Sequence, residues 1–422
     1  MVKPGRNYWL LLTSQFLSAF GDNLLIMVIL SALTAARATG QITEQAVNNA
    51  NALYSALFFL PFVLLAPLAG FLNDRYPKTT WLTGGNLIKL LGTSLGITGL
   101  LLHQDLHGLS YLIVGIGACC YSPAKYGILP EIVPADRLVK ANGTVEMLTL
   151  LAILGGLLAG GILMDHQPQT VGYLLVAATY GLSLLCNALM TRTHCNPAAG
   201  LRSSFGEFGG NLRLLLRHVR LGRILLGCGL FWFLGASLRN NLQSWGMEVL
   251  QQLNGVAPTN EQLALLKVWL ALGIILGSVA AGQCHRTGDL RGTRPYGWLM
   301  ALFTLGLGML GATGGRWTIH SLLILTGIAA GLFLVPLNAS LQHESDQTRL
   351  GKTIASQNFV DYLGMLLGAG FVWLCAQANL TTDAVFIALA AAIAILVVFL
   401  KTPPERAATE PVDTAPALPD RT

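Results

Sequence analysis

Charged side chains inside long apolar segments are the residues of this sequence most able to hold a charged ligand. Asp22 lies near the middle of the apolar segment 8–33, and Arg239 lies at a similar depth in the segment 222–247. One ionised Asp or Arg at the centre of a membrane helix costs roughly 2.5–3.5 kcal/mol on insertion scales. Both charges are therefore expected to face a bundle interior or an aqueous cavity, where Asp22 and Arg239 could pair.

Other charges lie inside such segments as well. Lys125 is close to the end of segment 108–129 and Glu146 is close to the start of segment 143–164, so a second ion pair is expected there. Lys89 and Asp361 lie at intermediate depth in segments 80–102 and 353–376. Lys267 also lies within or at the edge of a segment, 262–283, and the sequence indicates no role for it. Each pair could be a structural bridge, a gate or a ligand site.

The composition indicates a membrane protein. Of the 422 residues, 53% are hydrophobic and only 11% are charged, whereas soluble domains carry roughly 25% charged residues. The net charge of +6 is spread over short connections and forms no basic patch, so nucleic acid is not an expected partner. The seven cysteines show no CxxC or Cys/His metal spacing, and we expect them to be packing residues.

Apolar runs of about 20 residues, the length that crosses a bilayer, predict membrane-spanning helices throughout the chain. The first run is too long for a signal-peptide core, so it is expected to remain as the first span. The predicted spans are 8–33, 52–73, 80–102, 108–129, 143–164, 171–190, 222–247, 262–283, 295–313, 319–341, 353–376 and 382–401.

The basic residues predict the orientation. Of the 26 Lys and Arg residues, 20 fall on the side of residue 1, whereas the opposite connections hold only Arg37 and Arg316. Because basic loops stay in the cytoplasm, both termini are expected there.

The spans divide into two equal sets. We expect a first half at 1–190, a cytoplasmic linker at 191–221 that ends in a basic amphipathic helix, a second half at 222–402, and a disordered tail at 403–422. The segment "FLSAFGDN" (16–23) aligns with "FLGASLRN" (233–240), which places Asp22 opposite Arg239 in the two halves.

The connection "GFLNDRYPK" after the second span resembles the G-x-L-x-D-R-x-G-R-K/R loop of the major facilitator superfamily, although Tyr76-Pro77 replaces the second glycine. The resemblance implies an all-α integral membrane fold with twelve helices in two pseudo-symmetric six-helix halves. It also implies that Asp74 and Arg75 make gating contacts on the cytoplasmic face.

Four stretches are similar to the bacterial lysophospholipid transporter family within that superfamily. They are "QFLSAFGDN" (15–23), "GGNLIKLLG" (84–92), "YSPAKYGILPEIVPADRLVKANGTVE" (121–146) and "IASQNFVDYLGM" (354–365). The resemblance implies a monomeric secondary transporter or flippase, not an enzyme. Such a protein moves lysophospholipids across the bacterial inner membrane by alternating access for reacylation inside. A cytoplasmic acyltransferase or acyl-carrier-protein ligase is then a candidate partner.

A lysophospholipid offers a phosphate, often an ammonium, and one acyl chain. Arg239 and Lys125 are expected to bind the phosphate, and Asp22 the ammonium, with Asn23 and Asn240 as neutral hydrogen-bonding groups. Asp22, Arg239, Lys125, Glu146, Lys89 and Asp361 are the candidate gating charges.

Three alternatives stay open. No cofactor is expected. A proton or sodium ion could bind at Asp22 or Asp361 and drive transport. Alternatively, transport has no coupling ion. The cargo of an ion-coupled exporter could instead be a drug, siderophore or small metabolite. The rival class is a membrane enzyme, for which His103, Asp105 and His107 form an HxDxH pattern without a fourth metal ligand.

Overall fold

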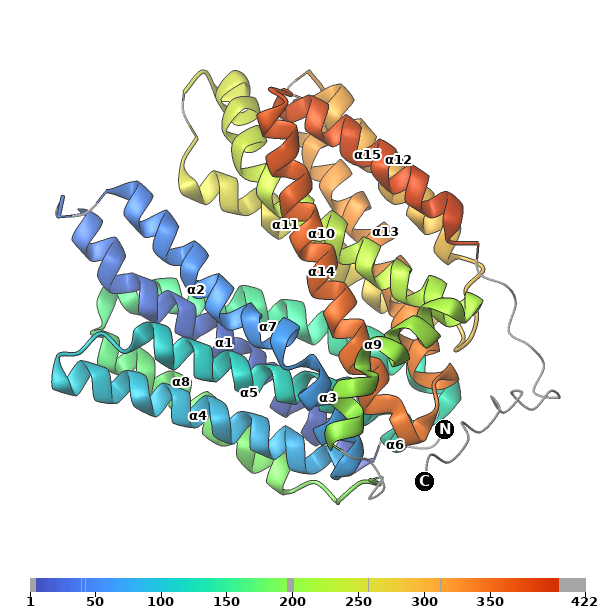
Figure 1. Ribbon diagram of the computed structural model, residues 1–422. Helices are drawn as coiled ribbons and strands as arrows, with labels where there is room; N and C mark the ends of the chain where they lie inside the picture. The colour runs from blue at the N-terminus through green and yellow to red at the C-terminus, as the bar shows by residue number, and fades with distance from the viewer. Residues whose placement is uncertain are drawn as a thin grey trace.

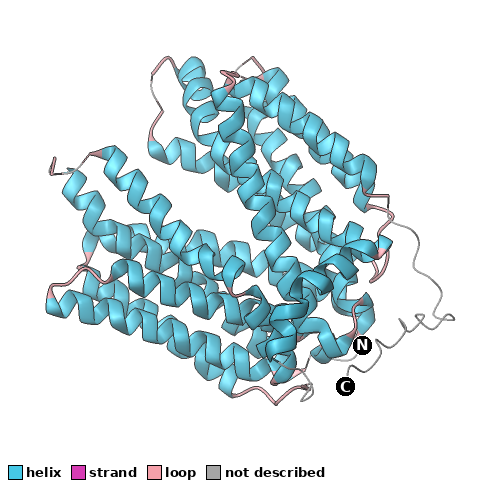
Figure 2. Ribbon diagram, viewed as in Figure 1, coloured by secondary structure: helices cyan, strands magenta, loops and turns pink. Residues whose placement is uncertain are grey.

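A computed structural model describes residues 5–38, 40–41, 43–195, 201–256, 258–311 and 313–401. All regular structure in these residues is helical (Figure 2). The helices form two groups, which lie close together at the end where α3, α6 and α9 are found and diverge toward the opposite end (Figure 1). The predicted disordered tail, 403–422, lies outside the described residues.

The first group packs around α1 (Arg6–Ala38). α1 lies against α7 and α8, and α4 lies against both α5 and α8. The short segments α6 (Leu129–Ile132) and η1 (Ala135–Arg137) connect α5 to α7. The remaining helices of this group are α2 (Glu44–Leu64), α3 (Ala66–Arg75), α4 (Lys78–Leu102), α5 (His107–Gly127), α7 (Leu138–His166) and α8 (Gln169–Ala188).

The second group repeats this plan around α10 (Val219–Asn254). α10 packs against α14 and α13, α11 against α13, and α12 against α15. Between the groups, α9 (Leu201–Arg217) contacts α3, α10 and α14. The other elements are α11 (Asn260–Cys284), α12 (Thr293–Leu310), α13 (Gly315–Glu344), η2 (Gln347–Arg349), α14 (Leu350–Gln377) and α15 (Thr382–Phe399).

A helix lies at each of the predicted spans. In the described residues, nine helices are long and apolar enough to cross a membrane, and a bent pair formed by α2 and α3 makes up to ten. α5 and α12 are not among them, but they lie at the predicted spans 108–129 and 295–313. α12 is short, with 18 residues, and includes Arg294, while α5 includes Lys125 and Pro123.

The predicted span 52–73 is broken in two. α2 ends at Leu64 and α3 begins at Ala66, with a bend of 57° between them. Pro67 lies in the first turn of α3. A proline has no amide proton and its ring collides with the preceding turn, so a continuous helix through this position is disfavoured.

Close packing inside the second group depends on glycine. A Cβ atom built at Gly277 of α11 would lie 2.2 Å from the carbonyl oxygen of Ile328, and one at Gly327 of α13 would lie 2.3 Å from that of Leu270. No side chain fits at these positions, so the two backbones touch directly. Such small-residue contacts are typical of helices packed within a bilayer.

Hydrogen bonds between the two groups gather at the end of the molecule where α3, α6 and α9 lie. Asn142 of α7 and Gln342 of α13 exchange two amide hydrogen bonds of 2.8 and 2.9 Å. Thr287, after α11, donates to the carbonyl oxygen of Ala135, and Asn358 of α14 donates to Ser122 of α5 over 3.1 Å. We call this end the basic end, because the helix ends and loops with Arg75, Lys78, Arg137, Arg286 and Arg291 lie there.

Candidate functional site

Asp22 is the centre of a polar network inside the first group. Lys89 of α4 donates to Asp22 Oδ2 from Nζ at 2.7 Å, and the hydroxyl of Tyr180 of α8 donates to Oδ1 at 2.7 Å. Lys89 also donates to Ser18 Oγ at 2.9 Å, and its side chain is only 2% exposed. The carboxylate therefore has a buried cation and a hydroxyl as direct partners.

The predicted pair of Asp22 with Arg239 is wrong in this structure. α1 packs within the first group, where Lys89 reaches the carboxylate from α4, whereas Arg239 is an exposed residue of α10 in the second group. The alignment of the two halves identified equivalent positions in α1 and α10. Equivalent positions in a repeat need not touch, and the nearer lysine takes the partner position.

The network continues toward the basic end through uncharged groups. Ser18 donates to Asn86 at 2.8 Å, and Asn86 donates to Ser183 at 2.7 Å. Ser14 then lies 2.9 Å from Ser183 and 3.0 Å from the hydroxyl of Tyr121. Buried polar groups that are satisfied in this way hold helices in one register. Asp22 and Lys89 are thus the charged part of a network that joins α1, α4, α5 and α8.

Arg239 lies in a different environment. In the described residues it forms no ion pair, and its side chain and that of Asn240 are exposed. Tyr111 of α5 lies within electrostatic range of both Asp22 and Arg239, so Arg239 is near the first group. An arginine in a membrane helix is costly when it faces lipid. We therefore expect Arg239 to face the space between the two groups.

Lys267 of α11 adds a second positive charge beside Arg239. Its ammonium lies within electrostatic range of Arg239 and donates to Gln243 of α10 at 2.8 Å. No carboxylate forms an ion pair with either cation among the described residues. Two cations without a carboxylate partner fit an anion such as a phosphate. The sequence showed Lys267 as a charge within a span, but it did not show that α11 brings Lys267 to Arg239.

Asn23 and Asn240 are not brought together by any hydrogen bond in the described residues. The amide of Asn23 donates to the carbonyl oxygen of Ala19 in its own helix at 2.8 Å. Its Cβ atom packs against Gly156 of α7, where an added Cβ would lie 3.0 Å away. Asn240 follows Arg239 on α10.

Lys125 and Glu146 lie close together without the predicted direct ion pair. Lys125 Nζ lies over the ring of Tyr126, 4.3 Å from its centre, and the Tyr126 hydroxyl donates to Glu146 Oε2 at 3.3 Å. Lys125 and Glu146 remain within electrostatic range. The prediction of a direct pair is therefore wrong, because Tyr126 contacts both charged groups and takes the carboxylate's hydrogen bond.

Asp361 of α14 is buried, with 8% of its surface exposed. Its Oδ1 atom has no hydrogen-bond partner among the described residues. The indole of Trp232 of α10 faces the carboxyl group, and Glu146 of α7 lies within electrostatic range. Neither the Trp232 contact nor the approach of Glu146 to Asp361 was evident from the sequence.

Asp74, for which a gating role is predicted, joins α3 to the start of α14. Asp74 Oδ1 accepts the amide proton of Gly351 at 2.6 Å, and Oδ2 accepts that of Lys352 at 3.2 Å. A carboxylate at a helix N-terminus is stabilised by the free amide groups and the helix dipole. Arg75 is half-buried and forms no ion pair in the described part of the chain.

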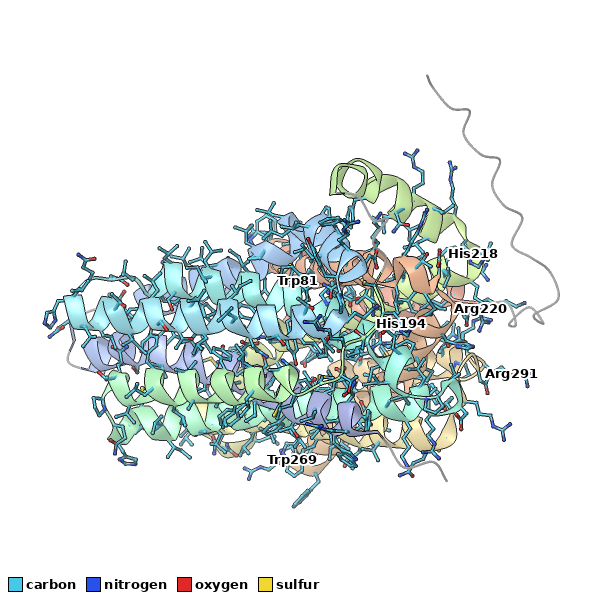
Figure 3. The ribbon with its side chains drawn as sticks, turned by 90° about the horizontal axis from the view of Figure 1, so that it is seen from below. Trp81, His194, His218, Arg220, Trp269 and Arg291 are labelled. Carbon is cyan, nitrogen blue, oxygen red and sulfur yellow. The ribbon has the colours of Figure 1, made fainter. Side chains whose placement is uncertain are left out.

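One ion pair in each group lies at the same end. Lys78 of α4 contacts Glu131 of α6 at 2.5 Å, and Glu131 also accepts the backbone amide proton of His194 at 3.1 Å. In the second group, Arg220 forms bonds of 2.6 and 2.7 Å to the two oxygens of Glu344. His194, His218, Arg220 and Arg291 all lie toward this end in Figure 3.

Asp74→Asn is expected to open the basic end. The amide would remove the charge that holds the start of α14, a loss of about 1–3 kcal/mol. Ala355, buried at 1% exposure against Gly70, gives a reporter. In a protein with Cys195 and Cys284 changed to serine, Ala355→Cys should react with a soluble maleimide about tenfold faster in the Asp74→Asn background. The exposed acid Asp136→Asn is the control, and equal rates in both variants would contradict a gating role.

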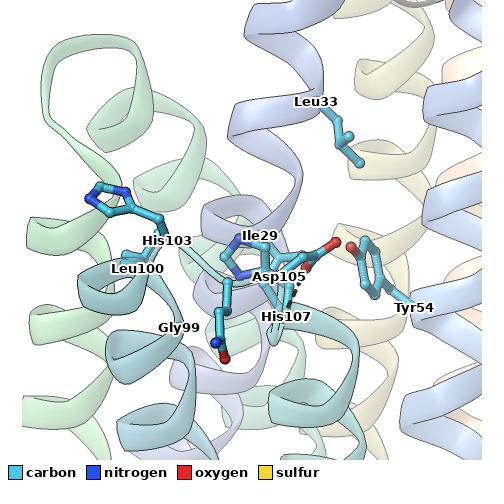
Figure 4. Close-up of a pocket in the computed structure, with 9 residues that line it drawn as sticks. Ile29, Leu33, Tyr54, Gly99, Leu100, His103, Asp105 and His107 are labelled. Atoms are coloured by element: carbon cyan, nitrogen blue, oxygen red, sulfur yellow. Dashed lines mark hydrogen bonds between the residues drawn. The ribbon is translucent and has the colours of Figure 1, made fainter.

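The HxDxH pattern lies at the opposite end, in a pocket between α1, α2, α4 and α5 (Figure 4). His107 Nδ1 lies 2.7 Å from the Tyr173 hydroxyl, and Asp105 accepts the backbone amide proton of His107 at 3.2 Å. His103 has a left-handed backbone, with φ 54°, and ends α4. Among the described residues, no group of three or more His, Cys, Asp or Glu side chains could hold a metal ion.

Known protein families and sequences are similar to this chain. Residues 11–369 match the family model of the Major Facilitator Superfamily. A lysophospholipid transporter of Photorhabdus laumondii is 35% identical over 363 residues, covering 85% of this chain and 86% of the relative. A lysophospholipid transporter of Enterobacter sp. is 34% identical over 394 residues, covering 91% and 92%.

Several solved structures have a fold similar to that of this chain. A human organic anion transporter has a TM-score of 0.75 at 16% identity, covering 95% of this chain and all of its own. The fucose:proton symporter of E. coli has a TM-score of 0.72 at 13% identity, covering 93% of this chain and 97% of its own. At these identities the similarity concerns the fold alone.

Proposed function

The chain belongs to the major facilitator superfamily, and we propose that it moves lysophospholipids across the bacterial inner membrane by alternating access and delivers them to the cytoplasmic leaflet for reacylation. The observation that carries this proposal is the identity of 33–35% to lysophospholipid transporters over most of both chains. The arrangement of Arg239 and Lys267 supports it, because every lysophospholipid carries a phosphate.

The phosphate would first meet Arg239 and Lys267, on the second group. Arg239 presents a planar fork of donors, which suits two phosphate oxygens, and Lys267 adds a point charge. Lys125 lies near the end of α5 and would receive the phosphate closer to the basic end. Its ammonium rests on a tyrosine ring instead of a carboxylate, so it can turn to an anion without breaking an ion pair.

The acyl chain needs apolar surroundings between the groups. Tyr362 of α14 packs against Phe59 and Phe62 of α2, with ring centres 5.4 and 4.4 Å apart. Parting these rings would expose an apolar wall between the groups. α2 and α14 are therefore the helices between which the chain would extend toward lipid.

Alternating access requires the contacts at the basic end to open. Those contacts are the amide exchange of Asn142 with Gln342 and the bonds from Asp74 to the start of α14. Hydrogen bonds join the groups there together with an apolar cluster, in which Val335 and Ala339 of α13 lie with Val145 of α7. A ligand can shift the balance between states by as much as its binding free energies to the two states differ. The concentration of basic loops supports a cytoplasmic location for this end and for both termini.

The partners follow from the same proposal. A cytoplasmic acyltransferase or acyl-carrier-protein ligase would consume the delivered lipid, and the transporter would act as a monomer. No catalytic residue is assigned.

Uptake into spheroplasts tests the proposed cargo. Spheroplasts that lack their own lysophospholipid transporter should take up labelled lysophosphatidylethanolamine when they produce this protein, and should not expel a panel of drugs, siderophores and small metabolites. The protein with Arg239→Gln, produced at equal abundance, controls for leakage. Export of the solutes without lipid uptake would instead favour an ion-coupled exporter.

A further inference from the structure

Asp361 is a buried carboxyl group with an incomplete set of partners. It is 8% exposed, and its Oδ1 atom accepts no hydrogen bond in the described residues. The indole N–H of Trp232 is the donor that faces the carboxyl group. An ionised carboxyl group held away from water by one neutral donor would be strongly destabilised, so a further positive group is needed to complete this site.

The groups within electrostatic range of Asp361 come from both halves. α10 contributes Trp232 and Cys228, α14 itself contributes Tyr362, and α5 and α7 contribute Tyr126 and Glu146. Of these, only Glu146 carries a charge, and it is negative. Glu146 is 5% exposed, so both carboxyl groups are more than nine-tenths buried.

The local charges do not balance. Lys125 is within electrostatic range of Glu146, and Lys89 is bound to Asp22. Each of these lysines offsets one carboxylate. Asp361 is the acid left over, because no ion pair involves it in the described part of the chain. One additional positive charge would balance the cluster.

We infer that Glu146 and Asp361 form a site for one monovalent cation between the two halves. The cation is the ammonium of a lipid head group or a free ion, either a proton or sodium. This inference rests on the proposed transport of lysophospholipids and adds a second ligand to it. The unpartnered oxygen of Asp361 receives the cation, and Glu146 supplies the second negative charge.

The placement of the two acids links the cation to the motion of the halves. Glu146 is on α7 of the first half and Asp361 is on α14 of the second. When the halves part at the basic end, the acids separate and the site loses one of its charges. A cation bound between them would therefore favour the state in which the two acids are close.

Head-group chemistry distinguishes the two sources of the cation. Purified protein in liposomes is offered lysophosphatidylethanolamine, which has an ammonium, and lysophosphatidylglycerol, which does not, with and without imposed sodium and pH gradients. If the ammonium is the ligand, Asp361→Asn should slow transport of the ethanolamine lipid about tenfold or more and leave the glycerol lipid unchanged. If a free cation is the ligand, both lipids should respond to one gradient in wild type, and Asp361→Asn should abolish that response.

Two further variants sharpen the result. Asp361→Glu keeps the charge and should retain the head-group preference or gradient response, whereas Glu248→Gln removes an exposed carboxylate that bonds to Thr382 and should behave as wild type. Wild-type protein that transports both lipids equally and ignores both gradients would overturn the inference even if Asp361→Asn fails to fold. Wild-type protein that transports neither lipid would instead overturn the proposed function.

Discussion

Arg239→Gln is expected to lower lysophosphatidylethanolamine uptake by about 10- to 100-fold without changing the amount of protein in the membrane. A hydrogen bond to a charged group contributes about 1.5–3 kcal/mol, and each 1.4 kcal/mol corresponds to about tenfold in affinity. Arg239 is exposed and forms no ion pair in the described residues, so its loss should leave the fold intact. Initial uptake rates in spheroplasts, divided by membrane abundance, measure the effect.

Matched variants separate a phosphate contact from general charge. Lys267→Gln should reduce uptake by about tenfold, because Lys267 contributes a point charge and lacks the planar fork of donors that arginine has. Arg316→Gln removes an arginine that bonds to Asn254 at the opposite end and should leave uptake unchanged. A protein with Arg239→Gln that transports at the wild-type rate would exclude Arg239 as the phosphate ligand.

Lys89→Met is expected to be the most destabilising single substitution in the polar network. Removing one member of a buried ion pair leaves the other charge without a partner, which costs about 3–5 kcal/mol. Among the described residues, Asp22 would keep only the Tyr180 hydroxyl as a direct partner. The variant should melt well below wild type in detergent and accumulate poorly, as measured by fluorescence-detected size-exclusion after heating.

The double variant tests whether this pair is structural. Asp22→Asn with Lys89→Met removes both charges, and it should recover most of the melting temperature lost by Lys89→Met alone. Uptake should recover with it. If Asp22→Asn alone melts like wild type and yet abolishes uptake, Asp22 is a substrate ligand, as the sequence suggested, and the structural interpretation of the pair is contradicted.

The positions of the helices were predictable because a helix that crosses the bilayer needs an apolar segment as long as the bilayer is thick. Even the two less apolar helices, α5 and α12, lie at predicted spans. The break between α2 and α3 was missed, although Pro67 was visible. A proline in an apolar run can bend a helix or interrupt it, and the packing of neighbouring helices decides which occurs.

The partners of the buried charges were less predictable. The free-energy cost of burying the Asp22 carboxylate shows that it needs a cation. From the sequence alone, Lys89 and Arg239 satisfy that requirement equally well. Only the rotation of α1 and α4 selects Lys89. Similarly, Lys125 lies in the last turn of α5 and Glu146 lies two turns inside α7, which begins at Leu138. The position of the Tyr126 ring between them depends on side-chain geometry. The approach of Lys267 to Arg239 depends on the packing of α10 and α11.

The most direct test of a phosphate-dependent lipid site compares two lipids that differ at that group. Purified protein in liposomes transports labelled lysophosphatidylethanolamine while an unlabelled competitor is added, either lysophosphatidylglycerol or a monoacylglycerol with the same chain and no phosphate. We predict that lysophosphatidylglycerol competes and the monoacylglycerol does not, and that Arg239→Gln removes this difference. Equal competition by the two lipids would show that the protein selects the acyl chain alone, and would contradict a phosphate site at Arg239 and Lys267.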